Sequence, residues 1–69
     1  MLIEYIGGTI RKRRKQLGIT QPHLAELAQV SPNTVYKLER GKVNASLEVI
    51  ERLADVLGME IELKVKVKK

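Results

Sequence analysis

The sequence predicts a mainly α-helical fold, a lambda-repressor-like bundle of four to five short helices followed by a C-terminal β-strand. Two observations predict it. Apolar residues recur at helical spacing between residues 6 and 57, in segments separated by residues that start or stop helices. From residue 59 onward, apolar and charged residues alternate strictly, which is typical of a strand. We therefore divide the chain into a helical domain, 1–58, and a strand with a basic tail, 59–69.

The composition limits the classes of protein to consider. A chain of 69 residues, 43% of them hydrophobic, is one domain with a small core, and burial against a partner is expected at this size. Because there is no cysteine, disulfides, thiolate metal sites and a cysteine nucleophile are excluded. The sequence contains neither a signal peptide nor a transmembrane run, so we expect a cytoplasmic protein without membrane contact.

The net charge of +5 is unevenly distributed along the chain. Residues 11–42 carry eight Lys and Arg against two Glu, a net charge of +6, whereas residues 43–63 carry a net charge of −4. The last six residues add four lysines. Positive charge concentrated in one part of a domain is typical of nucleic-acid binding, and a membrane-surface patch is the alternative.

The first helix is expected to end at Gly18. Its buried side is marked by Ile6, Ile10 and Leu17. Two adjacent glycines, Gly7 and Gly8, reduce helix propensity by about 1–2 kcal/mol near its start, which leaves the number of helices open between four and five.

Two short helices around a tight turn follow, at about 21–28 and 32–40. Thr20 can cap the first, and Pro22 is tolerated in its first turn. The apolar stripe of this helix consists of Leu24, Ala25, Leu27 and Ala28. Ser31 and Pro32 form a strong start signal for the second helix, and Gly41 ends it.

The second of these helices keeps several polar side chains off its buried face, which Val35 and Leu38 define. The residues outside that face are Pro32, Asn33, Thr34, Tyr36, Lys37 and Arg40. An amide, a hydroxyl and a long cation suit base edges and phosphates in the major groove of DNA. An ordinary solvated face is the alternative, and composition alone does not decide between the two.

The spaced pattern I-R-x-x-R-x-x-x-G-x-T-Q-x-x-L-A at 10–25, followed by V-S-x-x-T-V-x-x-L-E-R-G at 30–41, resembles the Cro/lambda-repressor-type (XRE) helix-turn-helix family. The resemblance covers residues 6–57. It implies a bundle of four or five helices in which the third helix lies in the major groove of double-stranded DNA.

The resemblance also implies roles for individual residues. Arg14 would form a structural ion pair with Glu39 rather than contact DNA. Base contacts are expected from Pro32, Asn33, Thr34 and Lys37, since Asn can pair with adenine and Lys with guanine. Contacts to the DNA backbone are expected from Gln21, His23, Ser31, Tyr36, Arg40, Lys42 and Asn44. For each contact residue, plain solvent exposure is the alternative.

A last helix is expected to begin after Ser46, its N-cap, and to stop at Gly58. Its apolar stripe consists of Leu47, Ile50, Leu53, Ala54 and Leu57. We interpret this helix as part of the core.

The C-terminal strand places four apolar residues on one face: Ile61, Leu63, Val65 and Val67. A single strand cannot satisfy its own backbone, so we expect it to pair with the same strand of a second copy. Antiparallel pairing centred on Leu63 sets Glu62 opposite Lys64 and Glu60 opposite Lys66, which is favourable. Pairing with residues 1–6 of the same chain is the alternative.

These features predict a sequence-specific DNA-binding repressor that acts as a homodimer on a palindromic operator. The short domain followed directly by a strand is similar to the HipB-like antitoxins, so an antitoxin or adaptor that holds a partner protein, for example a kinase toxin, is the alternative. The sequence contains no paired acids, activated nucleophile, phosphate-binding glycine loop or metal cluster, so we expect no enzyme activity, cofactor, metal or small-molecule substrate.

Overall fold

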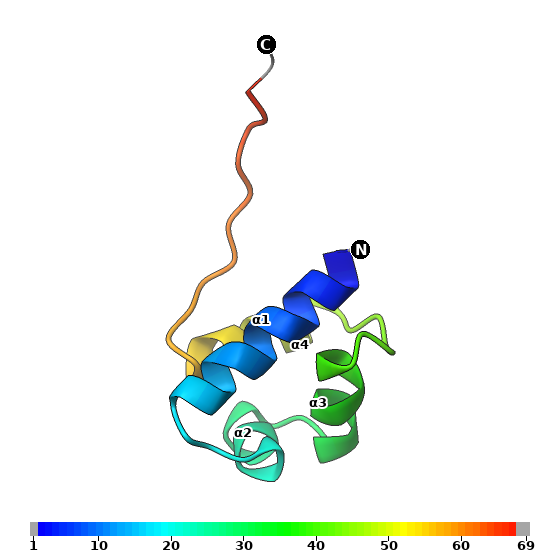
Figure 1. Ribbon diagram of the computed structural model, residues 1–69, viewed down its shortest axis with the longest axis vertical. Helices are drawn as coiled ribbons and strands as arrows, with labels where there is room; N and C mark the ends of the chain where they lie inside the picture. Colours follow the sequence, from blue (N-terminus) through cyan, green and yellow to red (C-terminus); the bar gives the residue numbers. More distant parts are fainter. Residues whose placement is uncertain (1, 68–69) are drawn as a thin grey trace.

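A computed structural model describes residues 2–67, and its folded part consists of four helices. These are α1 (Leu2–Gln16), α2 (Gln21–Ala28), α3 (Pro32–Glu39) and α4 (Leu47–Val56). α3 packs against α1 and α2, and α2 also packs against α4 (Figure 1). The predicted mainly α-helical fold is confirmed, with four helices in the described range.

Hydroxyl side chains start three of the helices, as the sequence predicts. Each accepts a hydrogen bond from the backbone N–H three residues on: Thr20 from His23 at 3.2 Å, Ser31 from Thr34 at 3.1 Å and Ser46 from Val49 at 3.2 Å. The turn between α2 and α3 is closed by Gln29, whose φ of 59° is left-handed. Its N–H donates to the carbonyls of Ala25 and Glu26, which ends α2 without a glycine.

The core is built from all four helices. Its largest fully buried side chains are those of Leu24, Val35, Leu38, Leu53 and Leu57. Three predicted core residues lie outside it, because Leu17 is 44% exposed, Leu27 is 52% exposed and Leu47, in the first turn of α4, is 68% exposed. Leu17 follows the last residue of α1 and lies in a turn, whereas Leu27 lies at the edge of the α2 stripe, whose centre the smaller Ala25 and Ala28 already fill.

The predicted C-terminal strand is not formed in the single chain. Residues 59–67 have no regular secondary structure, and Leu63, Val65 and Val67 are each at least 88% exposed. This tail leads away from the helices, on the side of the molecule opposite α2 (Figure 1). The reason is physical: one strand has no backbone partner within one chain. Lys68 and Lys69, which the prediction included, lie outside the described residues, as does Met1.

The alternative partner for the tail, a strand at residues 1–6, is wrong. Residues 2–6 belong to α1, so their backbone groups bond within the helix and cannot form a ladder. The tail of one chain is therefore left without a strand to pair with in the described range.

Close contact between α1 and α3 depends on Gly7. A Cβ atom at this position would collide with the carbonyl oxygen of Leu38 and would lie 3.3 Å from Cα of Glu39. At the neighbouring Gly8, by contrast, no atom lies within 4 Å of an added Cβ. Gly7 therefore permits the approach of the two helices, whereas Gly8 contributes only flexibility.

The two glycines should respond in opposite ways to substitution by alanine. We expect Gly7→Ala to lower the free energy of unfolding by about 3 kcal/mol or more, because a backbone oxygen stands where the methyl group must go. Gly8→Ala should raise it by about 0.5–1 kcal/mol through better helix propensity. Urea unfolding followed by circular dichroism measures both, and equal effects of the two changes would contradict this packing.

Candidate nucleic-acid interface

α3 presents a polar face that is held in place by its buried side. Val35 and Leu38 are fully buried, which fixes the rotation of the helix about its axis. Five of the side chains on the opposite side are exposed: Pro32, Asn33, Tyr36, Lys37 and Arg40. Thr34 is half-buried, and its hydroxyl lies 2.9 Å from the hydroxyl of Ser31. An amide, an ammonium and a guanidinium therefore remain available for an external partner.

A buried ion pair connects α3 to α1. Arg14 donates from Nε to Oε2 of Glu39 at 2.7 Å and from Nη2 to Oε1 at 2.9 Å, so the two groups meet in parallel. Both residues are buried. The hydrogen bonds and the charge of Glu39 raise the pKa of Arg14, although burial opposes this, so the guanidinium stays charged. The ion pair expected from the family resemblance is thus present.

The same pair also holds the start of α2. Nε2 of Gln21 donates to Oε1 of Glu39 at 3.0 Å, and Nη1 of Arg14 donates to the carbonyl of Ile19 at 3.0 Å. Within the described residues, no buried side-chain nitrogen or oxygen lacks a hydrogen-bond partner. Gln21 therefore steadies α3, and its half-buried side chain lies at the edge of the exposed face.

A polar hollow of about 430 Å³ opens beside α3. It is lined by Arg11, Gln21, Tyr36, Glu39 and Arg40. The guanidinium of Arg40 lies 5.3 Å from the centre of the Tyr36 ring, which orients it. Since Glu39 is already paired, two further guanidinium groups remain at the hollow, and an anion such as a phosphate is the group that they suit.

Arg11 is the residue of this hollow that the sequence did not predict. It belongs to the run of basic residues at 11–15, in which spacing alone does not single out one member. The sequence feature that could have indicated Arg11 is its position three residues before Arg14, because residues three apart are neighbours on the surface of one helix.

The other predicted backbone contacts are exposed but are not all together. His23 lies in the first turn of α2, and Ser31 caps α3 with its own side chain. Lys42 is exposed in the loop after α3. Asn44 lies instead beside an apolar groove at the N-terminal ends of α1 and α4, apart from the polar hollow.

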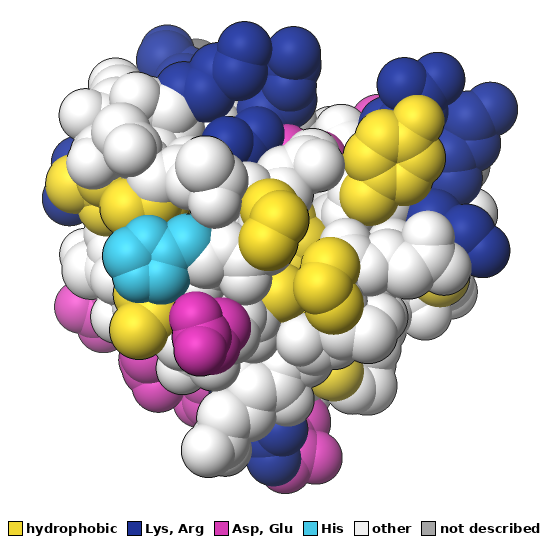
Figure 2. All heavy atoms as spheres, turned by 90° about the horizontal axis from the view of Figure 1, so that it is seen from below, with side chains coloured by type: hydrophobic (Ala, Val, Ile, Leu, Met, Phe, Trp, Pro, Cys, Tyr) yellow, Lys and Arg dark blue, Asp and Glu magenta, His cyan; other side chains and the backbone are white. Residues whose placement is uncertain are grey.

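Charge is segregated on the surface that carries α2 and α3. Lys and Arg side chains gather in two groups along one edge, and acidic side chains lie along the other edge (Figure 2). No group of three or more His, Asp or Glu side chains within residues 2–67 could hold a metal ion. Nor is any helix in this range long and apolar enough to cross a membrane.

The family model described as "Helix-turn-helix" matches residues 10–64, most of the chain. This chain belongs to the XRE-type helix-turn-helix family of transcriptional regulators. An uncharacterized helix-turn-helix transcriptional regulator of Methanothermobacter thermautotrophicus is 45% identical over 51 residues, which are 74% of each chain. The immunity repressor protein of Bacillus phage phi105 is 36% identical over 81% of this chain and 39% of its own length.

The helix-turn-helix arrangement is also found in solved structures. The crystal structure of the clp gene regulator ClgR from Corynebacterium glutamicum matches with a TM-score of 0.83 and 35% identity, over 87% of this chain and 64% of that one. Longer relatives exist, since this chain spans only 24% of an archaeal helix-turn-helix relative from Pyrobaculum aerophilum, at 36% identity.

Removing the arginine of the buried pair should destabilise the helix-turn-helix far more than removing the arginine of an exposed pair. Arg14→Met leaves the carboxylate of Glu39 buried without its charge partner, and we expect a loss of about 3–5 kcal/mol in the free energy of unfolding. Urea unfolding of the purified variant measures this loss.

Arg52→Met is the matched control, since it breaks an exposed pair with Glu48 on α4 at 3.1 Å. We expect it to cost at most about 0.5 kcal/mol. The structural role of Arg14 would be wrong if both variants were equally stable and Arg14→Met lost only DNA binding.

Proposed function

We propose that this protein is a sequence-specific repressor that binds double-stranded DNA as a homodimer on a palindromic operator. One observation carries the proposal: α3 exposes Asn33, Lys37 and Arg40 on a helix whose position a buried ion pair fixes from behind. A helix that is rigidly held and polar outward can place its side chains against base edges with the precision that sequence recognition requires.

The chemistry of α3 supports direct reading of bases. The amide of Asn33 can bond adenine through two groups, and the ammonium of Lys37 can donate to guanine. Pro32 and the methyl group of Thr34 offer apolar contact to a thymine methyl group. These four residues are the proposed base contacts, in the first turns of α3.

The basic hollow supports backbone binding beside the recognition helix. Arg11 lines it from α1 and Arg40 from the C-terminal end of α3, and Gln21 and Tyr36 add polar groups. We infer that a DNA phosphate occupies this hollow, with His23, Ser31 and Lys42 as further backbone contacts; Asn44, which lies beside the apolar groove, is not among them. Phosphate contacts of this kind set the register of α3 on the duplex and make binding depend steeply on salt.

The homodimer is supported by the tail, whose alternating apolar residues have no partner within the described chain. A two-fold axis would set the two recognition helices about 34 Å apart, one turn of DNA, and would require an inverted repeat in the operator. The phage relative is named an immunity repressor, which supports repression as the outcome of DNA binding. We propose the cytoplasm as the compartment in which the protein acts.

Selection of bound duplexes from a random DNA library, at near-physiological salt, tests the proposal. We expect enrichment of an inverted repeat with half-sites about one turn apart. If the folded protein enriches no sequence, the proposal of specific binding fails. Co-purification with a kinase-like toxin would then favour the antitoxin alternative, for which the acidic α4 offers a surface with Glu48, Glu51 and Asp55 exposed.

Replacing a base-reading side chain should lower discrimination rather than binding as a whole. We expect Asn33→Ala and Lys37→Ala each to reduce the preference for the selected operator over random DNA by about 1–3 kcal/mol. Fluorescence anisotropy titrations on both duplexes measure the two affinities. An equal loss on the two duplexes would contradict a base contact.

Replacing a residue that contacts the DNA backbone should have the opposite effect: a loss of affinity without a loss of sequence discrimination. Arg11→Ala should weaken binding to all sequences alike and reduce the slope of log K against log salt by about 1. Lys12→Ala removes a neighbouring exposed cation that does not line the hollow, and it should leave this slope less changed. Identical slopes for the two variants would exclude a phosphate from the hollow.

The tail register can be tested by cross-linking, because the chain has no native cysteine. Antiparallel pairing centred on Leu63 brings the two copies of that residue directly opposite each other, so Leu63→Cys should form an intermolecular disulfide under mild oxidation. In the same register the two copies of Val65→Cys are four residues apart along the strands, about 13 Å, and should not react. Non-reducing electrophoresis separates the outcomes, and cross-linking of Val65→Cys alone would exclude this register.

A further inference from the structure

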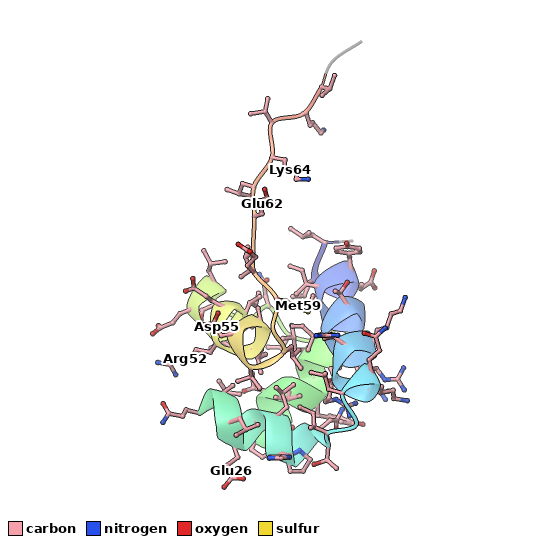
Figure 3. The ribbon with its side chains drawn as sticks, turned by 90° about the vertical axis from the view of Figure 1, so that its left-hand side faces the viewer. Glu26, Arg52, Asp55, Met59, Glu62 and Lys64 are labelled. Atoms are coloured by element: carbon pink, nitrogen blue, oxygen red, sulfur yellow. The ribbon has the colours of Figure 1, made fainter. Side chains whose placement is uncertain are left out.

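The tail begins at a helix end whose backbone is held by hydrogen bonds. Gly58, two residues after α4, has a left-handed φ of 72°, and its N–H donates to the carbonyl of Asp55 at 3.2 Å. The N–H of Met59 then donates to the carbonyl of Ala54 at 2.8 Å. The side chain of Met59 packs against the core, between α4 and α1 (Figure 3). The path of the chain is therefore fixed as far as Met59.

Arg13 of α1 binds the same helix end from the side. Its Nε donates to the carbonyl oxygen of Leu57 at 2.9 Å, although 44 residues separate the two along the chain. Its Nη2 would lie 3.6 Å from a Cβ atom at Gly58, so the half-buried guanidinium lies against the turn itself. A cation at the C-terminal end of a helix is favoured by the helix dipole and by the carbonyls that the helix leaves unpaired. Arg13 thus connects the first residues of the tail to α1.

The residue next to Arg13 connects α1 to the polar face. Arg14 holds α3 through both oxygens of Glu39, as described above. Successive residues of an α-helix are rotated by about 100°, so the two arginines can hold two different elements from one turn of α1. The direction in which the tail leaves the helices is therefore fixed relative to the polar face of α3.

Beyond Met59 the described tail has no regular secondary structure. Residues 60–67 are exposed, and Glu62 and Lys64 lie beyond the helices (Figure 3). When two tails pair as the proposed function requires, each stiffens the other through backbone hydrogen bonds. The joint between this two-stranded ribbon and each helical domain then lies at residues 57–60. The separation and relative rotation of the two α3 helices in the dimer depend on that joint.

We propose that Arg13 is a positioning residue for operator spacing: by holding the start of the tail against α1, it fixes which separation of half-sites the dimer accepts. This inference rests on the dimer of the proposed function. Each base pair added between the half-sites moves them about 3.4 Å apart and rotates one of them by about 35° around the DNA axis. A rigid joint resists this displacement, whereas a loose joint can follow it.

A series of duplexes tests the inference. It carries the selected operator with no, one or two base pairs inserted between the half-sites, and a duplex with a single half-site completes it. Two inserted base pairs rotate one half-site by about 70°, so we expect the affinity of the wild type to fall at least about tenfold. Arg13→Met keeps the hydrocarbon stem but loses the bond to Leu57, and the fall should shrink to about threefold or less.

Lys12→Met is the matched control. It removes the same charge from the neighbouring exposed residue, and it should keep the wild-type fall in affinity. Fluorescence anisotropy measures every affinity, and the readout is the ratio between duplexes. A lost phosphate contact or a less stable fold would weaken binding to every duplex alike, so neither would change this ratio.

A second variant tests the joint without touching Arg13. Two glycines inserted between Met59 and Glu60 leave the helix end intact and loosen the chain directly after it. This variant should lose the preference for one spacing and keep the wild-type affinity for a single half-site. If Arg13→Met loses its helical circular dichroism signal, the glycine variant decides, and a sharp spacing preference in it overturns the inference.

The outcomes separate this inference from the proposed function. If Arg13→Met keeps the wild-type ratio, the inference is overturned while the dimer stands. A wild type that binds the single half-site as tightly as every full operator overturns the dimer and the inference together, and its half-site affinity still reports DNA reading by α3. A reduced ratio for Arg13→Met beside an unchanged ratio for Lys12→Met supports the inference.

Discussion

Arg14 and Glu39 meet where α1, α3 and the start of α2 come together, and the position of the exposed face depends on this pair. Because both residues are buried, each charge requires the other, and a helix that moved would leave one of them uncompensated. Gly7 makes the pair geometrically feasible, since only a residue without a side chain lets α1 approach the backbone of α3 so closely. Stability and function are coupled here: the contact that fixes the bundle also fixes the orientation of the polar residues.

The basic hollow and the apolar groove lie on different parts of the surface. α2 and α3 lie at one end of the molecule, and the tail extends from the other (Figure 1). The basic hollow is lined by residues of α1, α2 and α3, whereas the apolar groove is lined by residues at the N-terminal ends of α1 and α4. The charge distribution follows this division only in part: α4 carries three acidic residues against one arginine, but the described part of the tail carries Lys64 and Lys66 as well as Glu60 and Glu62.

Several apolar residues of this small chain lie outside its core, on the tail, where Leu63, Val65 and Val67 are exposed. With ten buried hydrophobic residues, the core within the described range is small, and the tail adds a further set of apolar side chains that are exposed in the single chain. Small domains commonly gain stability by association. Burial of the tail against a second copy would therefore serve stability and operator symmetry at once.

The sequence by itself determined the helices, their caps and most of the core, because these depend on local spacing and on residues such as Thr20, Ser31 and Ser46 that act on their nearest neighbours. The family pattern also indicated the pair of Arg14 with Glu39. Only the tertiary structure decided that Leu17 and Leu27 stay exposed, that Arg11 joins Arg40 at one hollow, and that Asn44 lies at a different surface from that hollow. These outcomes depend on how separate helices approach one another, which spacing along the chain does not encode. For the tail, alternation predicted a strand that residues 59–67 do not form in the single chain, since a strand exists only when a partner supplies its hydrogen bonds.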